Sequence, residues 1–407
     1  MSIFESVEDC LPRLRLSTVS MPSAELGPPS PLPPLPGAGD SPAETGADEL
    51  PDEVAANLGY GRAASILPYP TQDDYGRSRR WRDHRVAVLD NGILRAIIAL
   101  DLGGRLLSLV DISAGRELLY RNPVFQPANL ALRNAWFSGG VEWNIGTTGH
   151  GPLTCASMHA ARVDTPTGPI LRLWEFERLR GVPYQLDFML PEGSPLLYVG
   201  VRIVNPHRET VPMYWWSNIA VPDRPRTRVV APAESAYRFS YEGRLTLIDA
   251  PRHQGRDYSY PANAPHLADY FFRVDDDVTP WIAAVDGDGT GMFQASTRRL
   301  RGRKLFVWGN GSGGRRWQNW LTEPGTGGYL EIQAGLARTQ LEHVPMPGGD
   351  SWEWLEAYGP IDTDPAAVHD SDWSKARRAV ATTLATVVPT GALEARFANW
   401  RMDRDRP

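Results

Sequence analysis

Short apolar or alternating runs follow one another from about residue 80 to residue 358. Residues 85–90 and 93–98 flank Asn91-Gly92, a dipeptide typical of the tight turn in a β-hairpin because it adopts positive φ without strain. Clusters of Gly, Pro and Asn separate the later runs, and no segment of helical period interrupts them: 170–177, 196–205, 212–221, 281–285, 304–308, 329–341 and 352–358. The pattern predicts an all-β fold of antiparallel strands.

The beginning of the chain differs from this β region. Within an N-terminal segment of residues 1–21, residues 13–19 alternate between polar and apolar side chains and predict one strand at a sheet edge. Residues 22–66 begin with a proline-rich run, which buries too little apolar surface to offset the entropy of ordering. We therefore expect a disordered linker over residues 22–66.

The end of the chain changes to a helical pattern. Asp372 or Ser371 is a suitable N-cap, and Pro389 would stop the helix after about Val388. We expect this helix to pack back on the β body. The expected parts are therefore the N-terminal segment 1–21, the linker 22–66, a β body over 67–362 and a helical tail over 363–407.

The composition supports a folded, β-rich protein. The 407 residues are 42% apolar and 22% charged, which excludes global disorder. The chain has 14 Trp, 38 Gly and 36 Pro, a combination that favours strands and turns with aromatic surfaces over a helical bundle. No uncharged apolar run approaches the roughly 20 residues of a membrane span, so we expect no membrane partner.

Charge and missing motifs narrow the function further. The net charge of −6 would repel the phosphates of a nucleic acid. The N-terminus carries Glu5, Glu8 and Asp9 and lacks the apolar segment of a signal peptide, so we expect a cytoplasmic protein. The sequence contains no phosphate-binding Gly-x-x-x-x-Gly-Lys-[Ser/Thr] run, no His-Glu-x-x-His and no Gly-x-Ser-x-Gly. Neither a cofactor nor a metal ion is therefore expected.

The run 329–334 is the first candidate for chemistry. In a strand, Tyr329, Glu331 and Gln333 share one face, while the residues between them face the core. A carboxylate beside an amide would suit a sugar-sized cleft. The alternative is a Glu that simply faces solvent.

The run 352–358 collects Trp352, Trp354, Glu356 and Tyr358 on one face. Aromatic faces with a polar rim suit sugar rings, which have C–H patches and hydroxyl edges. The alternative is that these aromatic residues fill the core between two sheets. Glu356 on the same face argues against such a dry core.

Residues 134–151 form the densest group of chemically capable side chains. Glu142, Asn144 and His150 are embedded among tryptophans, of which Trp143 lies between the first two. An imidazole and a carboxylate at one cleft are the minimum for acid–base catalysis. The alternative is a loop whose polar groups satisfy its own backbone.

Two further runs are weaker candidates. In the strand 214–218, Trp216 and Asn218 share a face, although core packing is the default role of such an aromatic strand. The basic run 298–304 could bind an anionic sugar or a phosphate. A solvated loop is the more common role of such a charge run.

Several of these segments resemble galactose-mutarotase-like proteins. Residues 102–111 and 115–120 resemble their opening hairpins, and Leu330-Glu331-Ile332-Gln333 resembles the strand that carries the general base of aldose 1-epimerases. The stretch from about residue 67 to 362 is similar to an uncharacterised domain family often found ahead of tetratricopeptide repeats, with markers at 136–144, 214–218 and 331–335. The resemblance implies an antiparallel β-supersandwich and a carbohydrate ligand.

One departure from the epimerase pattern bears on mechanism. Aldose epimerases place a catalytic His in the strand that aligns with residues 214–220, where this chain has Ser217 and Asn218. Neither side chain delivers a proton near neutral pH as an imidazole does. His150 is a candidate to substitute from another loop.

The leading hypothesis is a carbohydrate-binding, mutarotase-like protein in which Glu331 acts as acid or base and His150 or Glu142 is the complementary group. Gln333, Asn144, Asn218 and Arg133 would orient hydroxyl groups, and Trp143, Trp216 and Trp354 would stack on the sugar ring. One alternative is a glycoside hydrolase that pairs Glu331 with Glu142 or Glu356. Another is a non-catalytic sugar sensor or interaction module.

Overall fold

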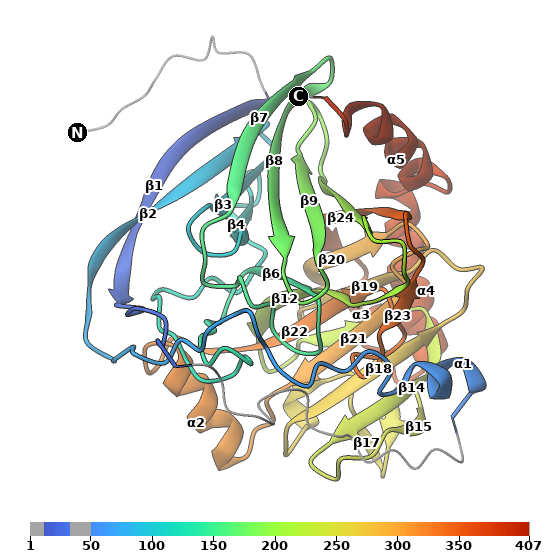
Figure 1. Ribbon diagram of the computed structural model, residues 1–407. Coiled ribbons are helices and arrows are strands. Elements are labelled where there is room, and N and C mark those ends of the chain that lie inside the picture. Colours follow the sequence, from blue (N-terminus) through green and yellow to red (C-terminus); the bar gives the residue numbers. More distant parts are fainter. Residues whose placement is uncertain (1–11, 33–49, 407) are drawn as a thin grey trace.

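Two antiparallel sheets lie face to face in the computed structural model, which describes residues 12–32 and 50–406 (Figure 1). The larger sheet has twelve strands, in the spatial order β1 (Arg13–Ala24), β2 (Arg79–Asp90), β3 (Leu94–Ala99), β4 (Arg105–Asp111), β6 (Val141–Ile145), β12 (Trp215–Asp223), β22 (Gly328–Gly335), β21 (Gly302–Val307), β18 (Ala268–Val274), β14 (Ala233–Ser240) and β15 (Thr246–Asp249), with β5 (Arg116–Glu117) paired to β4.

The smaller sheet has eight strands, in the order β13 (Arg228–Val230), β19 (Trp281–Val285), β20 (Thr290–Ser296), β24 (Ser351–Asp362), β10 (Leu197–Val204), β9 (Val182–Met189), β8 (Gly168–Glu177) and β7 (His159–Thr165). Two short pairs complete the strands, β11 (Val211–Met213) with β23 (Val344–Met346) and β16 (Arg252–His253) with β17 (Arg256–Asp257). The predicted antiparallel β fold is confirmed.

Within the described residues, five α-helices accompany the sheets: α1 (Asp52–Asn57), α2 (Ser312–Leu321), α3 (Pro365–Val368), α4 (Trp373–Val387) and α5 (Ala392–Asp403). Helix α2 contradicts the expectation that no helix interrupts the series of strands. Its segment contains two adjacent glycines, which are unfavourable in a helix and typical of a turn. Among the described residues, no helix has the length and hydropathy that a membrane span requires.

The main core lies between the two sheets and follows strand alternation. Leu330, Ile332 and Ala334 of β22 face it, as the sequence predicted. Ile219 of β12 and Leu305 of β21, the two neighbouring strands, also face it. The residues between them on each strand therefore lie on the outer face of the larger sheet.

The start of the chain is more structured than the sequence predicted. The expected edge strand is β1, which pairs with β2 along all of its twelve residues. Part of the expected linker, residues 33–49, lies outside the described residues. The described remainder contradicts a disordered linker, because Val54 of α1 is buried beside Tyr214 and Trp216.

The C-terminal helices cover the smaller sheet, along one side of the molecule in Figure 1. Helix α4 is the predicted one, and the Asp372 carboxylate caps it by accepting from the backbone N–H of Ser374 and Lys375. Helix α5 was not predicted. Its Trp400 packs over Gly200 of β10, and the indole Nε1 donates to Asp187 of β9 at 2.8 Å.

Candidate functional site

The outer face of the larger sheet carries a row of polar side chains across four neighbouring strands. The register aligns Glu142 on β6, Asn218 on β12, Gln333 on β22 and Lys304 on β21. Directly opposed residues on neighbouring strands lie about 4.5–5.5 Å apart, so these four form a continuous strip. The alternation of each strand keeps all four on the face away from the core.

A second row runs beside the first on the same face. It aligns Ala220 on β12, Glu331 on β22, Phe306 on β21 and Asp269 on β18. Together the two rows place three carboxylates, an amide pair and an ammonium group on one patch of the sheet.

A cavity of about 220 Å³ lies over this patch. Four residues predicted from the sequence line it together: His150, Asn218, Glu331 and Gln333. The lining also includes residues that were not predicted as part of the site, among them Trp136, Asp269, Lys304, Phe306 and Trp308. The cavity thus joins a carboxylate and an imidazole from segments that are far apart in the sequence.

Glu331 is buried at the floor of this cavity, with 6% of its surface exposed. Its Oε2 accepts a hydrogen bond from Nε2 of Gln333 at 2.7 Å. Burial raises the pKa of the Glu331 carboxyl, while the nearby charges of His150 and Lys304 act in the opposite direction. A carboxylate with a raised pKa is a stronger base than one in water.

A chain of hydrogen bonds connects Lys304 to Glu331. The Lys304 ammonium donates to Oε1 of Gln340, Nε2 of Gln340 donates to Oε1 of Gln333 at 2.6 Å, and Gln333 donates to Glu331. Lysine can only donate, so the orientation of both amides is fixed. Lys304 also pairs with Asp269, with 2.8 Å between Nζ and Oδ1.

His150 is held by Glu142 and Trp136. Its Nδ1 lies 2.8 Å from Oε2 of Glu142, and the ring centroids of His150 and Trp136 are 4.5 Å apart. Burial opposes the charge of Glu142, yet the pKa of Glu142 is held well below its usual range. The charges of His150 and Arg105 and a 2.6 Å hydrogen bond from Thr154 outweigh that burial. Because an ionised carboxylate only accepts, Nδ1 of His150 carries a hydrogen and Nε2 is left for a ligand.

Glu142 itself lies behind the cavity rather than in its wall. In addition to His150, its carboxylate faces Nε1 of Trp136 at 3.0 Å, Thr154 at 2.6 Å and Arg105 at 3.5 Å. Both of its oxygen atoms thus have partners within the protein. Of the two groups predicted as partners for Glu331, only His150 reaches the cavity.

The aromatic walls differ from the prediction. Trp143, Trp216 and Trp354 were expected to stack on a sugar, but all three are buried in core clusters away from the cavity. Trp143 and Trp354 face the other sheet, and Trp216 packs over Gly302 and Gly335. Both faces of their strands are covered by other parts of the protein. The alternation of residues along a strand therefore could not show which tryptophans line a cavity.

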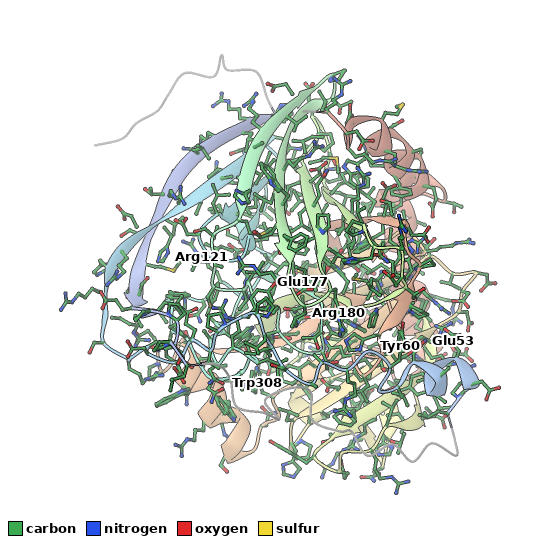
Figure 2. All side chains as sticks on the ribbon, viewed as in Figure 1. Glu53, Tyr60, Arg121, Glu177, Arg180 and Trp308 are labelled. Carbon is green, nitrogen blue, oxygen red and sulfur yellow. The ribbon has the colours of Figure 1, made fainter. Side chains whose placement is uncertain are left out.

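Trp136 and Trp308 form the aromatic walls instead. Trp136 belongs to the dense segment 134–151, and Trp308 follows Phe306 by two residues at the end of β21. Figure 2 shows Trp308 near α2, whose Trp317 stacks on it with the ring centroids 6.4 Å apart. The period-two spacing of Lys304, Phe306 and Trp308 is a signal in the sequence that could have identified this wall.

Glu356 is a further correction, because it lies in the core between the sheets. Its exposed fraction is 0%, and four donors surround its carboxyl group: Ser217, Gln294, Trp354 and Tyr358. Burial raises its pKa. The argument that a Glu on this face excludes a core was wrong, because hydrogen bonds satisfy the buried group.

Asn144 and Arg133 also lie outside the cavity. Asn144 accepts from the backbone N–H of Gly151 at 2.6 Å and so shapes the loop that carries His150. Arg133 donates to the carbonyl groups of Pro70 and Pro152 at 2.9 and 2.8 Å. Both residues hold loops in place and do not line the cavity.

The basic run 298–304 is only partly the solvated loop that was expected. Gly302–Val307 form β21, and Arg303 and Lys304 are both buried, on opposite faces of that strand. Arg303 donates to the carbonyls of Leu300 and Pro280 inside the core. Lys304 reaches the cavity, so this run supplies the ammonium group of the site.

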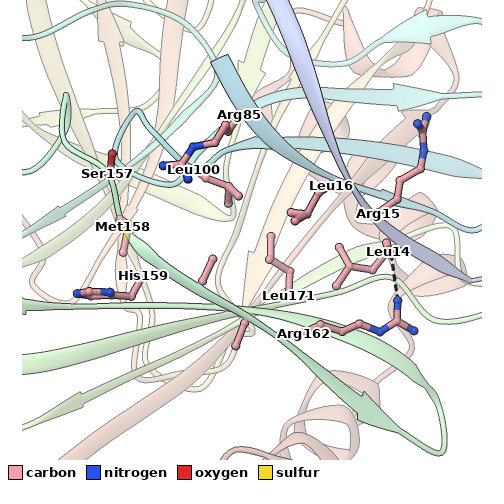
Figure 3. A pocket seen from close by; sticks show the side chains of 12 residues that line it. Leu14, Arg15, Leu16, Arg85, Leu100, Ser157, Met158, His159, Arg162 and Leu171 are labelled. Carbon is pink, nitrogen blue, oxygen red and sulfur yellow. Dashed lines mark hydrogen bonds between the residues drawn. The ribbon is translucent and has the colours of Figure 1, made fainter. Parts of the chain in front are cut away.

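A larger hollow of about 630 Å³ opens between the edge strands β1 and β7 (Figure 3). Leu14, Leu16, Leu100 and Leu171 point into it, and Arg162 donates to the carbonyl of Leu14 at 3.0 Å. None of its described lining residues is a carboxylate, and none belongs to the predicted site. Of these two cavities, only the smaller one has both a carboxylate and an imidazole in its described lining.

Comparisons with known proteins agree with the predicted resemblance. The model of a family described as "Domain of unknown function (DUF5107)" matches residues 62–347. The chain is similar to a TPR-domain containing protein from Parabacteroides distasonis ATCC 8503, with 22% identity, a TM-score of 0.70, and coverage of 86% of this chain and 55% of that one. The chain therefore spans about half the length of that protein.

A second structural match bears on the fold. The chain is similar to a galactose mutarotase-like protein from Clostridium acetobutylicum, with 12% identity, a TM-score of 0.50, and coverage of 69% of this chain and 96% of that one. At such identities a structural match shows the fold alone. The fold is galactose mutarotase-like, as the sequence predicted.

Proposed function

The chain belongs to the DUF5107 family, and from the site of this member we propose that the protein binds a carbohydrate over Glu331 and transfers protons at its anomeric centre. The observation that carries the proposal is that Glu331 and His150 line one small cavity. Opening a cyclic sugar requires a base at the anomeric hydroxyl and an acid at the ring oxygen. This cavity offers one candidate for each.

The proposed step uses these two groups in a balanced way. The Glu331 carboxylate takes the proton of the anomeric hydroxyl while Nε2–H of His150 gives a proton to the ring oxygen. The bond between the anomeric carbon and the ring oxygen breaks, leaving an open-chain aldehyde. Reclosure on the other face reverses both transfers and yields the other anomer.

Glu142 supports His150 in this proposal. Its carboxylate is 2.8 Å from Nδ1 and stabilises the positive charge that the ring carries before it donates. It also fixes which nitrogen faces the ligand. Glu142 is thus a positioning residue, not the acid or base.

The size and walls of the cavity suit one sugar unit. Its volume of about 220 Å³ is below the roughly 300–1,000 Å³ of pockets for drug-sized ligands. Trp136 and Trp308 offer indole surfaces to the C–H patches of a sugar ring, and Asn218 and Gln333 offer amide groups to its hydroxyls.

The geometry disfavours the two alternatives. Glycoside hydrolysis needs a second carboxylate free to act near Glu331, but donors occupy Glu142, and Glu356 lies on the core side of the sheet. Asp269 lines the cavity but is ion-paired with Lys304 at 2.8 Å. A sugar sensor needs aromatic and hydrogen-bonding groups only. Such a sensor does not require an imidazole that is oriented by a carboxylate, as His150 is by Glu142, next to the carboxyl group of Glu331.

The test is the rate of anomer interconversion. A single anomer of each of several neutral monosaccharides is dissolved with the protein, and proton NMR monitors the appearance of the other anomer. A shift of the melting temperature identifies the sugars that bind. We expect Glu331→Gln to keep binding and to lower the rate by about 10²–10⁴-fold. The control is Glu192→Gln, which should leave the rate unchanged because Glu192 is exposed and does not line the cavity. Equal rates in wild type and E331Q would refute the proposal.

A further inference from the structure

The charged groups of the cavity over Glu331 are almost all paired within the protein. Of the lining residues, Lys304, Asp269, Glu331 and His150 carry or can carry charge. Lys304 is 4% exposed and is held between Asp269, at 2.8 Å, and Gln340. His150 is held by Glu142 at 2.8 Å. No cation in the described wall is left uncompensated for an anionic ligand.

Most of the unpartnered polar atoms of the cavity are hydrogen-bond acceptors, although Nε1 of Trp308 is a buried donor without a hydrogen-bond partner among the described residues. Asn218 is 5% exposed, and its buried Oδ1 has no partner among the described residues. Glu331 uses Oε2 for Gln333, and no hydrogen bond to its Oε1 is found in residues 12–32 and 50–406. Buried acceptors without donors are costly, so the ligand should bring O–H or N–H groups to these two atoms.

An ionised phosphate or carboxylate cannot meet this demand, because it has acceptors only. Next to Glu331 and Asp269 it would also be a buried like charge, and Asp269 already balances the charge of Lys304. A sugar hydroxyl, in contrast, donates to Glu331 or Asn218 and can still accept the third N–H of Lys304.

We propose that the cavity selects uncharged sugars and rejects uronic acids and sugar phosphates, with Asp269 as the specificity-determining residue because it neutralises Lys304. This inference rests on the proposed carbohydrate function and adds the substrate class. Asp269 lies beside Phe306 in the register of β18 and β21, and its carboxylate reaches the ammonium group of Lys304, two residues from Phe306 on the same face of β21.

The test compares equilibrium binding of matched pairs by isothermal titration calorimetry: glucose with glucuronate and glucose 6-phosphate, and galactose with galacturonate. We expect the neutral member of a pair to bind at least 10-fold more tightly to the wild-type protein. Asp269→Asn frees the ammonium of Lys304 and should reduce this preference at least fivefold. Asp269→Glu keeps the charge and should retain the preference.

Asp83→Asn is the matched control, because Asp83 is exposed on β2 and lines neither cavity. It should leave the preference unchanged. Anionic sugars that bind as tightly as neutral ones to the wild type would overturn this inference and leave carbohydrate binding intact. Absence of binding by every sugar would overturn the proposed function, and this inference with it. If D269N is folded by circular dichroism and its preference for neutral sugars is unchanged, Asp269 does not determine the specificity.

Discussion

Glu142 and Glu331 lie on the same face of one sheet, yet their surroundings drive their carboxyl groups in opposite directions. The charges of His150 and Arg105 and the hydrogen bonds from His150 and Thr154 hold the pKa of Glu142 low despite its burial. Glu331 has one amide donor, and burial raises its pKa. Separating two acidic groups in this way is how a site obtains a fixed charge and an adjustable base from the same residue type.

The pairing of Glu142 with His150 makes a testable prediction. In Glu142→Gln, the side chain is neutral and can donate as well as accept, so the orientation of the imidazole hydrogens is no longer fixed. We expect anomer interconversion to slow by about 10²–10⁴-fold, with a changed pH dependence of the rate. Proton NMR measures the rate between pH 5 and 9.

The control for E142Q is Glu117→Gln. Glu117 also accepts hydrogen bonds from the protein, including the backbone N–H of Leu109 at 2.9 Å, but it does not line the cavity. We expect it to lose stability without losing rate. If E142Q reacts as fast as E117Q over the whole pH range, the positioning role of Glu142 is wrong.

Individual residues were predictable where alternation alone decides their place. The spacing of Glu331 and Gln333 put both on the outer face, and the structure agrees. Trp354 and Glu356 were assigned to the wrong surroundings because β24 is buried on both faces, between the other sheet and α5. A period of two gives the face of a residue but not what covers that face.

At the scale of elements, the site depends on which strands are neighbours. Strands β6, β12, β22 and β21 are adjacent in the sheet although they span residues 141 to 335. The sequence gives no direct signal of this order, because non-local pairing depends on the whole topology. Lys304 was therefore treated as part of a solvated basic run, although its strand places it beside Gln333.

Helix α5 depends on a close approach that can be tested. A Cβ added to Gly200 would lie 2.3 Å from the indole of Trp400. We expect Gly200→Ala to displace α5, to lower the free energy of unfolding by roughly 1–3 kcal/mol, and to speed amide exchange in residues 392–403. Urea unfolding and hydrogen–deuterium exchange measure the two effects.

Gly313→Ala is the control for this substitution. An added Cβ there meets no atom within 4 Å, and Ala is favoured over Gly in a helix by up to about 1 kcal/mol. We expect G313A to keep or raise stability. Equal exchange of α5 in G200A and wild type would show that the helix does not depend on this contact.

At the scale of the whole molecule, buried carboxyl groups make stability depend on pH. Burial raises the pKa of Glu342 from 4.5 to about 7, although Thr339 donates to it at 2.7 and 2.9 Å. Burial also raises the pKa of Asp223 to about 6. As pH rises from about 4.5 to 7, the unfolded chain releases these protons first, so the free energy of unfolding falls.

Glu342→Gln should remove its share of this pH dependence. From pH 5 to pH 7.5, we expect the free energy of unfolding of the variant to rise by roughly 2–3 kcal/mol relative to that of the wild type, because one pKa unit corresponds to about 1.4 kcal/mol. Urea unfolding at the two pH values measures the difference. Parallel stability curves for the two proteins would contradict the assignment.

The most direct test of the account as a whole is a crystal structure of E331Q with the sugar that binds best in the melting-temperature screen. We expect one sugar ring between Trp136 and Trp308, with its anomeric oxygen within about 3.2 Å of the side chain at position 331 and its ring oxygen facing His150. A sugar bound instead in the hollow between β1 and β7, or with its anomeric carbon directed out of the cavity, would contradict it.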